Sequence, residues 1–237
     1  MISWETRSGH VVRHVLGGRS NVFLLASGSA RILVDTGRSH RWPDLRDRLA
    51  QAGVDRLDAL ILTHAHFDHA ENARRVRDVY GATVILHQSE AGFLECGDAP
   101  LPAGSVLATR ILTRRLRRWL APRFRYDGCP VDVAVRDRLD LARWGFRGAV
   151  LHTPGHCRGA LSVVLDDDLA LVGDSMVNVA LWSVFPPFAD DISQLLDSWR
   201  RLLDTGCRLF LPGHGRAIAR ALLEQRYAER RRRVSMS

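Results

Sequence analysis

The chain has 237 residues, of which 46% are hydrophobic, and a formal net charge of +8. This length and composition are sufficient for a folded core and exclude a generally disordered chain. All 34 basic residues counted as Lys or Arg are arginine, and seven of them lie between Arg110 and Arg125 without an acidic residue among them. Because the rest of the chain is close to neutral, the net charge alone does not indicate a nucleic-acid-binding protein.

Neither a membrane span nor an export signal is expected. No apolar run approaches the roughly 18 residues that a transmembrane helix needs, and the first ten residues lack the basic-then-apolar order of a signal peptide. The four cysteines contain no C-x-x-C pair, so neither a disulfide framework nor a thiolate zinc site is indicated. We therefore expect a soluble, cytoplasmic protein whose thiols are reduced.

The first half of the chain has the pattern of strands followed by helices. Short apolar runs bounded by turn residues predict strands, and Pro43 and Gly81 mark the start and the end of helices. The expected elements are strands over 21–27 and 31–37, a helix over 43–52, a buried strand ending near Thr63, a helix over about 70–80 and a strand over 82–88.

The pattern changes between about residues 92 and 127, where a Pro/Gly-rich stretch precedes an expected basic helix over 106–120 that we interpret as an insertion. The expected later elements are strands over 131–135 and 148–154, a hairpin over 160–174 with its turn at Asp166–Asp168, a helix over 190–203, a strand over 208–214 and a basic helix over 217–233. No repeat or linker divides the chain, so residues 1–237 are expected to form a single domain. Strands precede helices twice, which predicts an α+β sandwich of two sheets with helices outside.

The stretch LTHAHFDHAEN places four potential metal ligands in six consecutive positions: His64, His66, Asp68 and His69. Alternate residues of an extended chain share a face, so His64 and His66 are expected to point to one side, while Asp68 and His69 enter the same cavity from the start of a helix. The alternative is that Asp68 caps that helix and the histidines are solvated loop residues. The density of the motif favours a metal site.

Three further apolar strands end with a potential ligand, namely His156 in TPGH, Asp174 in LVGD and His214 in LPGHG. Each of these is a weak signal, because such residues are common in turns. If Asp174 bridges two ions, one site consists of His64, His66 and His156, and the other of Asp68, His69 and His214. This set of nitrogen and oxygen donors suits two zinc ions per chain, and iron or manganese would also fit.

These motifs together, H-x-H-x-D-H, T-P-G-H, G-D and a late G-H-G, resemble the metallo-β-lactamase-fold hydrolase superfamily over residues 21–215. The resemblance implies a four-layer αββα sandwich with two mixed sheets and the metal centre at one sheet edge. Asp35 in VDTG matches a family position that supports the ligands from behind. Asp174 as the bridging residue resembles the glyoxalase II-like branch, whereas the tyrosine typical of lactonases is missing from the residues that follow it.

The expected function is a hydrolase in which two metal ions activate water to cleave a thioester, ester or lactone bond of a small-molecule substrate. Asp68 is expected to orient the nucleophile and carry its proton. An alternative on the same scaffold is a persulfide dioxygenase with one iron held by His64, His156 and Asp174. A nuclease is less favoured, because the family's nucleases carry an additional clamping domain, and neither a nucleic-acid partner nor an oligomeric state is predicted.

Weaker signals leave other residues with competing interpretations. The arginine-rich segment, Arg110 to Arg125, could be a solvated helix or a lid over the metal centre. The apolar residues Trp182 and 185–188 could line the substrate entrance or pack in the core. Cys157 is expected to be a plain thiol, because a histidine that binds metal cannot activate it.

Overall fold

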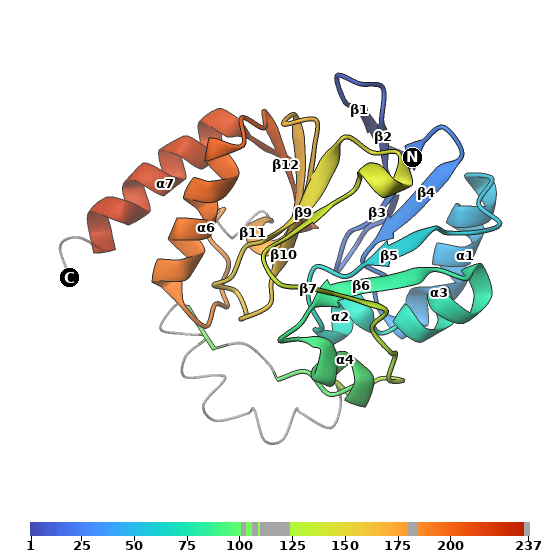
Figure 1. The fold of residues 1–237 in the computed structure, drawn as a ribbon. Coiled ribbons are helices and arrows are strands. Elements are labelled where there is room, and N and C mark those ends of the chain that lie inside the picture. The colour runs from blue at the N-terminus through green and yellow to red at the C-terminus, as the bar shows by residue number, and fades with distance from the viewer. Residues whose placement is uncertain (101–102, 106–108, 110–123, 180–183, 235–237) are drawn as a thin grey trace.

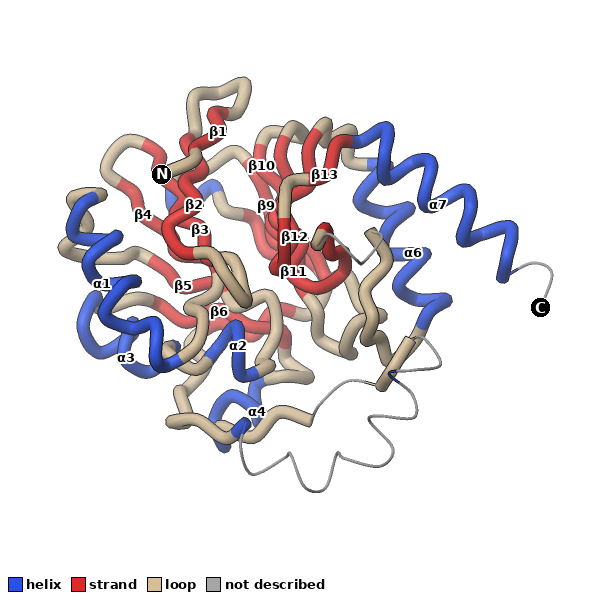
Figure 2. Tube along the Cα trace, turned by 180° about the vertical axis from the view of Figure 1, so that it is seen from behind, coloured by secondary structure: helices blue, strands red, loops and turns tan. Residues whose placement is uncertain are grey.

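The computed structural model describes residues 1–100, 103–105, 109, 124–179 and 184–234. Two mixed β-sheets pack face to face, and helices cover the outer face of each, so the predicted α+β fold with αββα layers is confirmed (Figure 1). The same layers are visible from behind, with α1 and α3 on one side and α6 and α7 on the other (Figure 2).

Within the described residues the first sheet has seven strands, in the order β1 to β7. They are β1 (Ser3–Glu5), β2 (Val11–Leu16), β3 (Val22–Ser27), β4 (Ala30–Val34), β5 (Ala59–Ile61), β6 (Thr83–His87) and β7 (Val133–Val135). Strands β1 to β4 are antiparallel and strands β4 to β7 are parallel. Because parallel strands need crossover connections, helices follow β4 and β5 and return the chain to the same sheet edge.

The second sheet, again counted over the described residues, has six strands in the order β13-β12-β11-β10-β9-β8. They are β8 (Arg138–Asp140), β9 (Gly148–His152), β10 (Leu161–Leu165), β11 (Leu169–Asn178), β12 (Leu209–Gly215) and β13 (Ile218–Ala219). The hairpin turn between β10 and β11 is confirmed, and Asp166 and Asp167 have the positive φ angles, 56° and 49°, that a tight hairpin turn requires.

Three apolar clusters hold the layers together. Residues of both sheets, including Leu25, Ile32 and Val163, form the core between the sheets. The outer face of the first sheet is covered by α1 (Trp42–Gln51), α2 (Phe67–Ala70), α3 (Ala73–Tyr80) and α4 (Ala91–Cys96). The outer face of the second sheet is covered by α6 (Ile192–Asp204) and the start of α7 (Arg220–Val234). Short 3-10 turns lie at Ser39–Arg41 and Ala142–Trp144.

The expected helix over 70–80 is wrong in its extent, because α2 and α3 are separate. Asn72 lies between them with φ −102° and ψ 9°, and its side-chain amide donates hydrogen bonds to the carbonyls of residues 36–38. The last helix starts at Arg220 instead of 217, because residues 218–219 pair with β12. The short helix α2, which carries Asp68 and His69, is therefore a separate element between β5 and α3.

Several predictions are not decided by the fold. The basic helix expected over 106–120 lies almost wholly outside the described residues, and α4 lies before it, at the start of the expected insertion over 92–127. The single-domain organisation with its insertion at 92–127 stays a prediction. No helix in the described part of the chain is long and apolar enough to cross a membrane. The cytoplasmic location also stays a prediction.

Candidate metal centre

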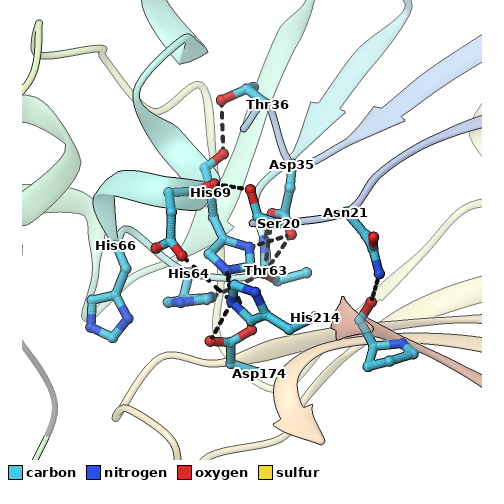
Figure 3. A network of polar contacts seen from close by, with 12 residues as sticks. Ser20, Asn21, Asp35, Thr36, Thr63, His64, His66, His69, Asp174 and His214 are labelled. Atoms are coloured by element: carbon cyan, nitrogen blue, oxygen red, sulfur yellow. Dashed lines mark hydrogen bonds and ion pairs between the residues drawn. The ribbon is translucent and has the colours of Figure 1, made fainter. Parts of the chain in front are cut away.

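The seven side chains proposed as metal ligands lie together at one edge of the two sheets. His64 and His66 follow β5, while Asp68 and His69 lie on α2. The second sheet contributes His156 from the β9–β10 connection, Asp174 from β11 and His214 from β12. Figure 3 shows His64, His69, Asp174 and His214 turned toward one another. The ligand atoms of the seven residues form three overlapping groups, and within each group these atoms lie within 4.8 Å of one another. Two of the groups share no residue and are described first and second below; the third, His64, His69 and Asp174, connects them.

The first group consists of His64, His66 and His156, all of which are buried. Nδ1 of His66 lies 3.1 Å from Nε2 of His156. The opposite ring nitrogens face carbonyl acceptors, His66 Nε2 at 3.1 Å from Pro100 O and His156 Nδ1 at 3.0 Å from Phe188 O. Since those carbonyls require N–H donors, two unprotonated nitrogens face each other when the rings are neutral. Among the described residues Nε2 of His64 has no hydrogen-bond partner and is buried, so all three nitrogens suit a shared cation.

The second group, Asp68, His69 and His214, repeats this arrangement. Nε2 of His69 lies 3.4 Å from Nε2 of His214, which lies 3.5 Å from Oδ2 of Asp68. The opposite nitrogens again face acceptors, His69 Nδ1 at 2.8 Å from Asp35 Oδ2 and His214 Nδ1 against the carbonyl of Arg19. When both rings are neutral, their unprotonated nitrogens therefore face each other across a second position that suits a cation.

Asp174 lies between the two groups. Its Oδ1 is 3.3 Å from Nε2 of His69, and its Oδ2 is 3.7 Å from Nε2 of His156 and 3.3 Å from Nε2 of His214. Oδ1 is buried, and no hydrogen-bond partner for it lies in the described part of the chain. A Cβ at Gly213 would lie 2.5 Å from this oxygen, so only glycine allows β12 to approach the carboxylate so closely. The carboxylate of Asp174 thus lies within reach of the histidines of both groups.

Asp35 lies behind the ligands. Its carboxylate accepts hydrogen bonds from Nδ1 of His69 at 2.8 Å, from the backbone N–H of Thr63 at 2.8 Å and from the Thr63 hydroxyl at 2.9 Å. The Thr63 oxygen in turn lies 3.0 Å from Nδ1 of His64. One carboxylate therefore orients His69 directly and His64 through Thr63. This role of Thr63 was not predicted, although a polar residue at the end of a buried strand was a signal for it.

The electrostatics of the cluster are those of a cation site. Burial, together with the neighbouring imidazoles, lowers the pKa of His64 and His66 well below the usual value. Burial would also lower the pKa of His69, but nearby carboxylates, Asp174 foremost, raise it well above its usual value. Burial would raise the pKa of Asp174, but His214 and His69 hold it well below its usual value. The carboxylate is therefore ionised, and positive charge beside it is favoured.

The chemistry of the donor set fits zinc. It combines imidazole nitrogens with carboxylate oxygens, which also suit iron or manganese, and none of the seven donors is a thiolate. The nearby Cys157 is buried, and its burial raises the pKa of the thiol well above its usual value, so it is a poor nucleophile. That the seven residues bind metal stays a prediction.

The structure describes only some of the apolar residues that were weighed as lining a substrate entrance, Trp182 and 185–188. Phe185 is buried against Trp199 in the core under α6, with ring centroids 6.0 Å apart, which favours its packing role. Trp182 and most of the segment from Arg110 to Arg125 lie outside the described residues. The carbonyls of Pro100 and Phe188, which accept from ligand histidines, were not predicted, because a backbone carbonyl has no sequence signature.

A four-layer sandwich that gathers histidines and aspartates at one edge of its sheets defines the metallohydrolase class of folds. The chain belongs to the metallo-β-lactamase superfamily, whose family model matches residues 15–214. The expected membership is thus confirmed. In structure the chain is similar to the metallo-β-lactamase family protein TTHA1429 of Thermus thermophilus, with a TM-score of 0.69 and 24% identity over 95% of this chain and 81% of that one.

Two relatives have names that state an activity. The acyl-coenzyme A thioesterase MBLAC2 of Homo sapiens is 27% identical over 84% of this chain and 74% of its own length. The atrochrysone carboxyl ACP thioesterase of Aspergillus fumigatus is 24% identical over 90% of this chain, which spans 58% of that protein. The chain is thus a member of a superfamily that includes hydrolases, and the names of these relatives do not define its own substrate.

Proposed function

We propose that the chain is a hydrolase that binds two divalent metal ions, with zinc as the expected metal, and cleaves a thioester, ester or lactone bond. The observation that carries this proposal is the pair of imidazole contacts, His66 to His156 and His69 to His214, on either side of Asp174. In each contact unprotonated nitrogens face each other when the rings are neutral, and a cation would relieve that repulsion. Two such contacts support two ions.

The protein's own groups have definite roles in this proposal. Bound divalent ions would supply Lewis acidity, which makes a water molecule easier to deprotonate and stabilises negative charge on a carbonyl oxygen. Asp68, whose side chain is 20% exposed, lies at the edge of the cluster and would accept the proton of the attacking water and deliver it to the leaving group. Asp35 and Thr63 would keep His69 and His64 in the tautomers that leave Nε2 free.

A thioester is the first substrate class to test. Two relatives are named thioesterases, one for acyl-coenzyme A and one for an acyl carrier protein. The central aspartate also favours a glyoxalase II-like member, and glyoxalase II resembles this chain in having an aspartate at the position of Asp174. We therefore expect hydrolysis of small acyl thioesters to exceed hydrolysis of a β-lactam.

The test is a substrate panel assayed before and after chelation and metal return. The panel contains an acyl-coenzyme A, an acylglutathione, a lactone, a chromogenic β-lactam and glutathione persulfide with oxygen uptake recorded. Zinc-dependent thioester hydrolysis is the expected result, and Asp68→Asn should lower kcat by about 10²- to 10⁴-fold. Oxygen uptake with the persulfide and iron, without hydrolysis, would replace the proposal by the one-iron dioxygenase.

A further inference from the structure

The connection between β2 and β3 ends in Arg19, Ser20 and Asn21, which we call the 19–21 clamp. It lies far in the sequence from the ligands yet contacts two of them. We propose that Ser20 and Asn21 are positioning residues for the second group of ligands, so that binding of one of the two ions depends on them. This inference rests on the proposed dinuclear function.

Asn21 holds the backbone on both sides of His214. It is 6% exposed, and its Nδ2 donates hydrogen bonds to Pro212 O and Gly215 O, each at 2.9 Å. Its backbone N–H donates to Gly213 O at 2.7 Å. Figure 3 shows the Asn21 side chain directed at this part of β12. Three hydrogen bonds from one residue therefore fix the four residues that contain the ligand.

The end of β12 around His214 depends on this support from another strand connection. The histidine is flanked by Gly213 and Gly215, and glycine restrains the backbone less than any other residue. A second contact acts on the ring itself, because Nδ1 of His214 donates to the carbonyl of Arg19. The orientation of the Asn21 amide is fixed by His14, whose Nε2 lies 3.0 Å from the Oδ1 of Asn21. The clamp thus sets both the position and the tautomer of His214.

Ser20 extends the clamp to another ligand of the same group. Its hydroxyl donates to the backbone carbonyl of Asp68 at 2.6 Å, and the residue is 4% exposed. In the first group, by contrast, His66 and His156 are oriented by carbonyls of Pro100 and Phe188. Within the described residues, the hydrogen bonds of the clamp reach ligands of the second group alone. Its loss should therefore weaken one ion and spare the other.

The experiment is a stepwise metal titration of the full chain, with zinc against a chromogenic chelator and with cobalt(II) followed by its absorption spectrum. Asn21→Asp keeps the size of the side chain but replaces the donor amide by an acceptor, and should weaken one of the two binding steps about 10- to 100-fold while the other is unchanged. Ser20→Ala removes a single hydrogen bond and should weaken the same step roughly fivefold. It serves as the milder variant if Asn21→Asp fails to fold.

The matched control is Asn178→Asp. Asn178 lies beside Gly215 in the pairing of β11 with β12, but its side-chain amide donates to the carbonyl of Ala217, at 3.2 Å, and among the described residues it forms no hydrogen bond with a candidate ligand. It should bind two ions as the wild type does. If both clamp variants bind both ions with wild-type affinity, the inference is overturned while the proposed function stands. Equal weakening of both steps would also overturn it, since that result means general support of the fold. A wild-type protein that binds one ion would overturn the proposed function and the inference with it.

Discussion

Replacing Asp35 by asparagine should weaken metal binding without disturbing the backbone. Asp35 has φ +61°, in the left-handed region that asparagine tolerates better than most residues, so Asp35→Asn keeps the local conformation. The amide can still accept from the Thr63 N–H through its oxygen, but its NH₂ then faces Nδ1 of His69. To avoid two facing donors, His69 must move its proton to Nε2, which is the atom directed at the metal position.

The size of this effect follows from the hydrogen bond that is lost. A hydrogen bond to a charged group contributes about 1.5–3 kcal/mol. At about 1.4 kcal/mol for each factor of ten, this corresponds to an affinity lower by roughly 10- to 100-fold. Replacing the partners that orient metal ligands in other proteins has effects in the same range. We therefore expect the ion at His69 to bind about 10- to 100-fold more weakly.

Competition with a chromogenic chelator measures this change, and circular dichroism of the metal-free protein checks the fold. Asp58→Asn is the matched control, because Asp58 also accepts from a backbone N–H, that of Arg31 at 2.8 Å, but has no hydrogen bond to a candidate ligand within the described residues. The control should bind zinc as the wild type does. Wild-type affinity in Asp35→Asn would refute the idea that this carboxylate sets the tautomer of His69.

Three further outcomes are expected. His66→Ala should lose the first ion and all hydrolysis, measured by elemental analysis and the thioester assay, and full activity with unchanged metal content would contradict this. The pKa of His69 and the pKa of His214 are raised above the usual 6.5, because the effect of neighbouring carboxylates outweighs that of burial. These rings therefore stay protonated as the pH passes 6.5, and each must lose a proton to bind metal. The metal affinity of the group of His69 and His214 should therefore rise with pH above 6.5, whereas the affinity of the group of His64, a residue whose pKa is lowered, should change little in that range. Metal titrations at a series of pH values, with proton release recorded, measure both affinities, and an equal dependence of the two on pH would contradict this expectation. Removing zinc should lower the thermal midpoint, since an ion at about 100 times its dissociation constant stabilises the fold by about 2.7 kcal/mol, and a midpoint insensitive to chelation would argue against binding in the folded state.

The fold was predictable where apolar runs were long and bounded by turn residues. Strands β3, β4, β6 and β9 to β12 satisfy this condition and were expected. Strand β2 was missed because Arg13 and His14 interrupt its apolar pattern, and β13 because it has only two residues. The break between α2 and α3 depends on hydrogen bonds from Asn72 to a loop about 35 residues away, which helix propensity does not contain.

The site was predictable to the extent that its chemistry is local. Four candidate ligands fall within His64 to His69, and the other three were expected where apolar strands end; their meeting at one sheet edge was implied by the family resemblance. In the structure His156 follows β9, whereas β11 and β12 continue to and beyond Asp174 and His214. The support of the ligands was less visible. Asn21 contacts a carbonyl 191 residues away, and backbone carbonyls carry no sequence signal. Such contacts exist only after the two sheets have packed.

The central claim is most directly tested by anomalous diffraction from crystals of the zinc-loaded protein. Two anomalous peaks roughly 3.5–4 Å apart are expected, with Asp174 between them and one imidazole pair at each. A single peak held by His64, His156 and Asp174, or density without any peak in this cavity, would contradict the account.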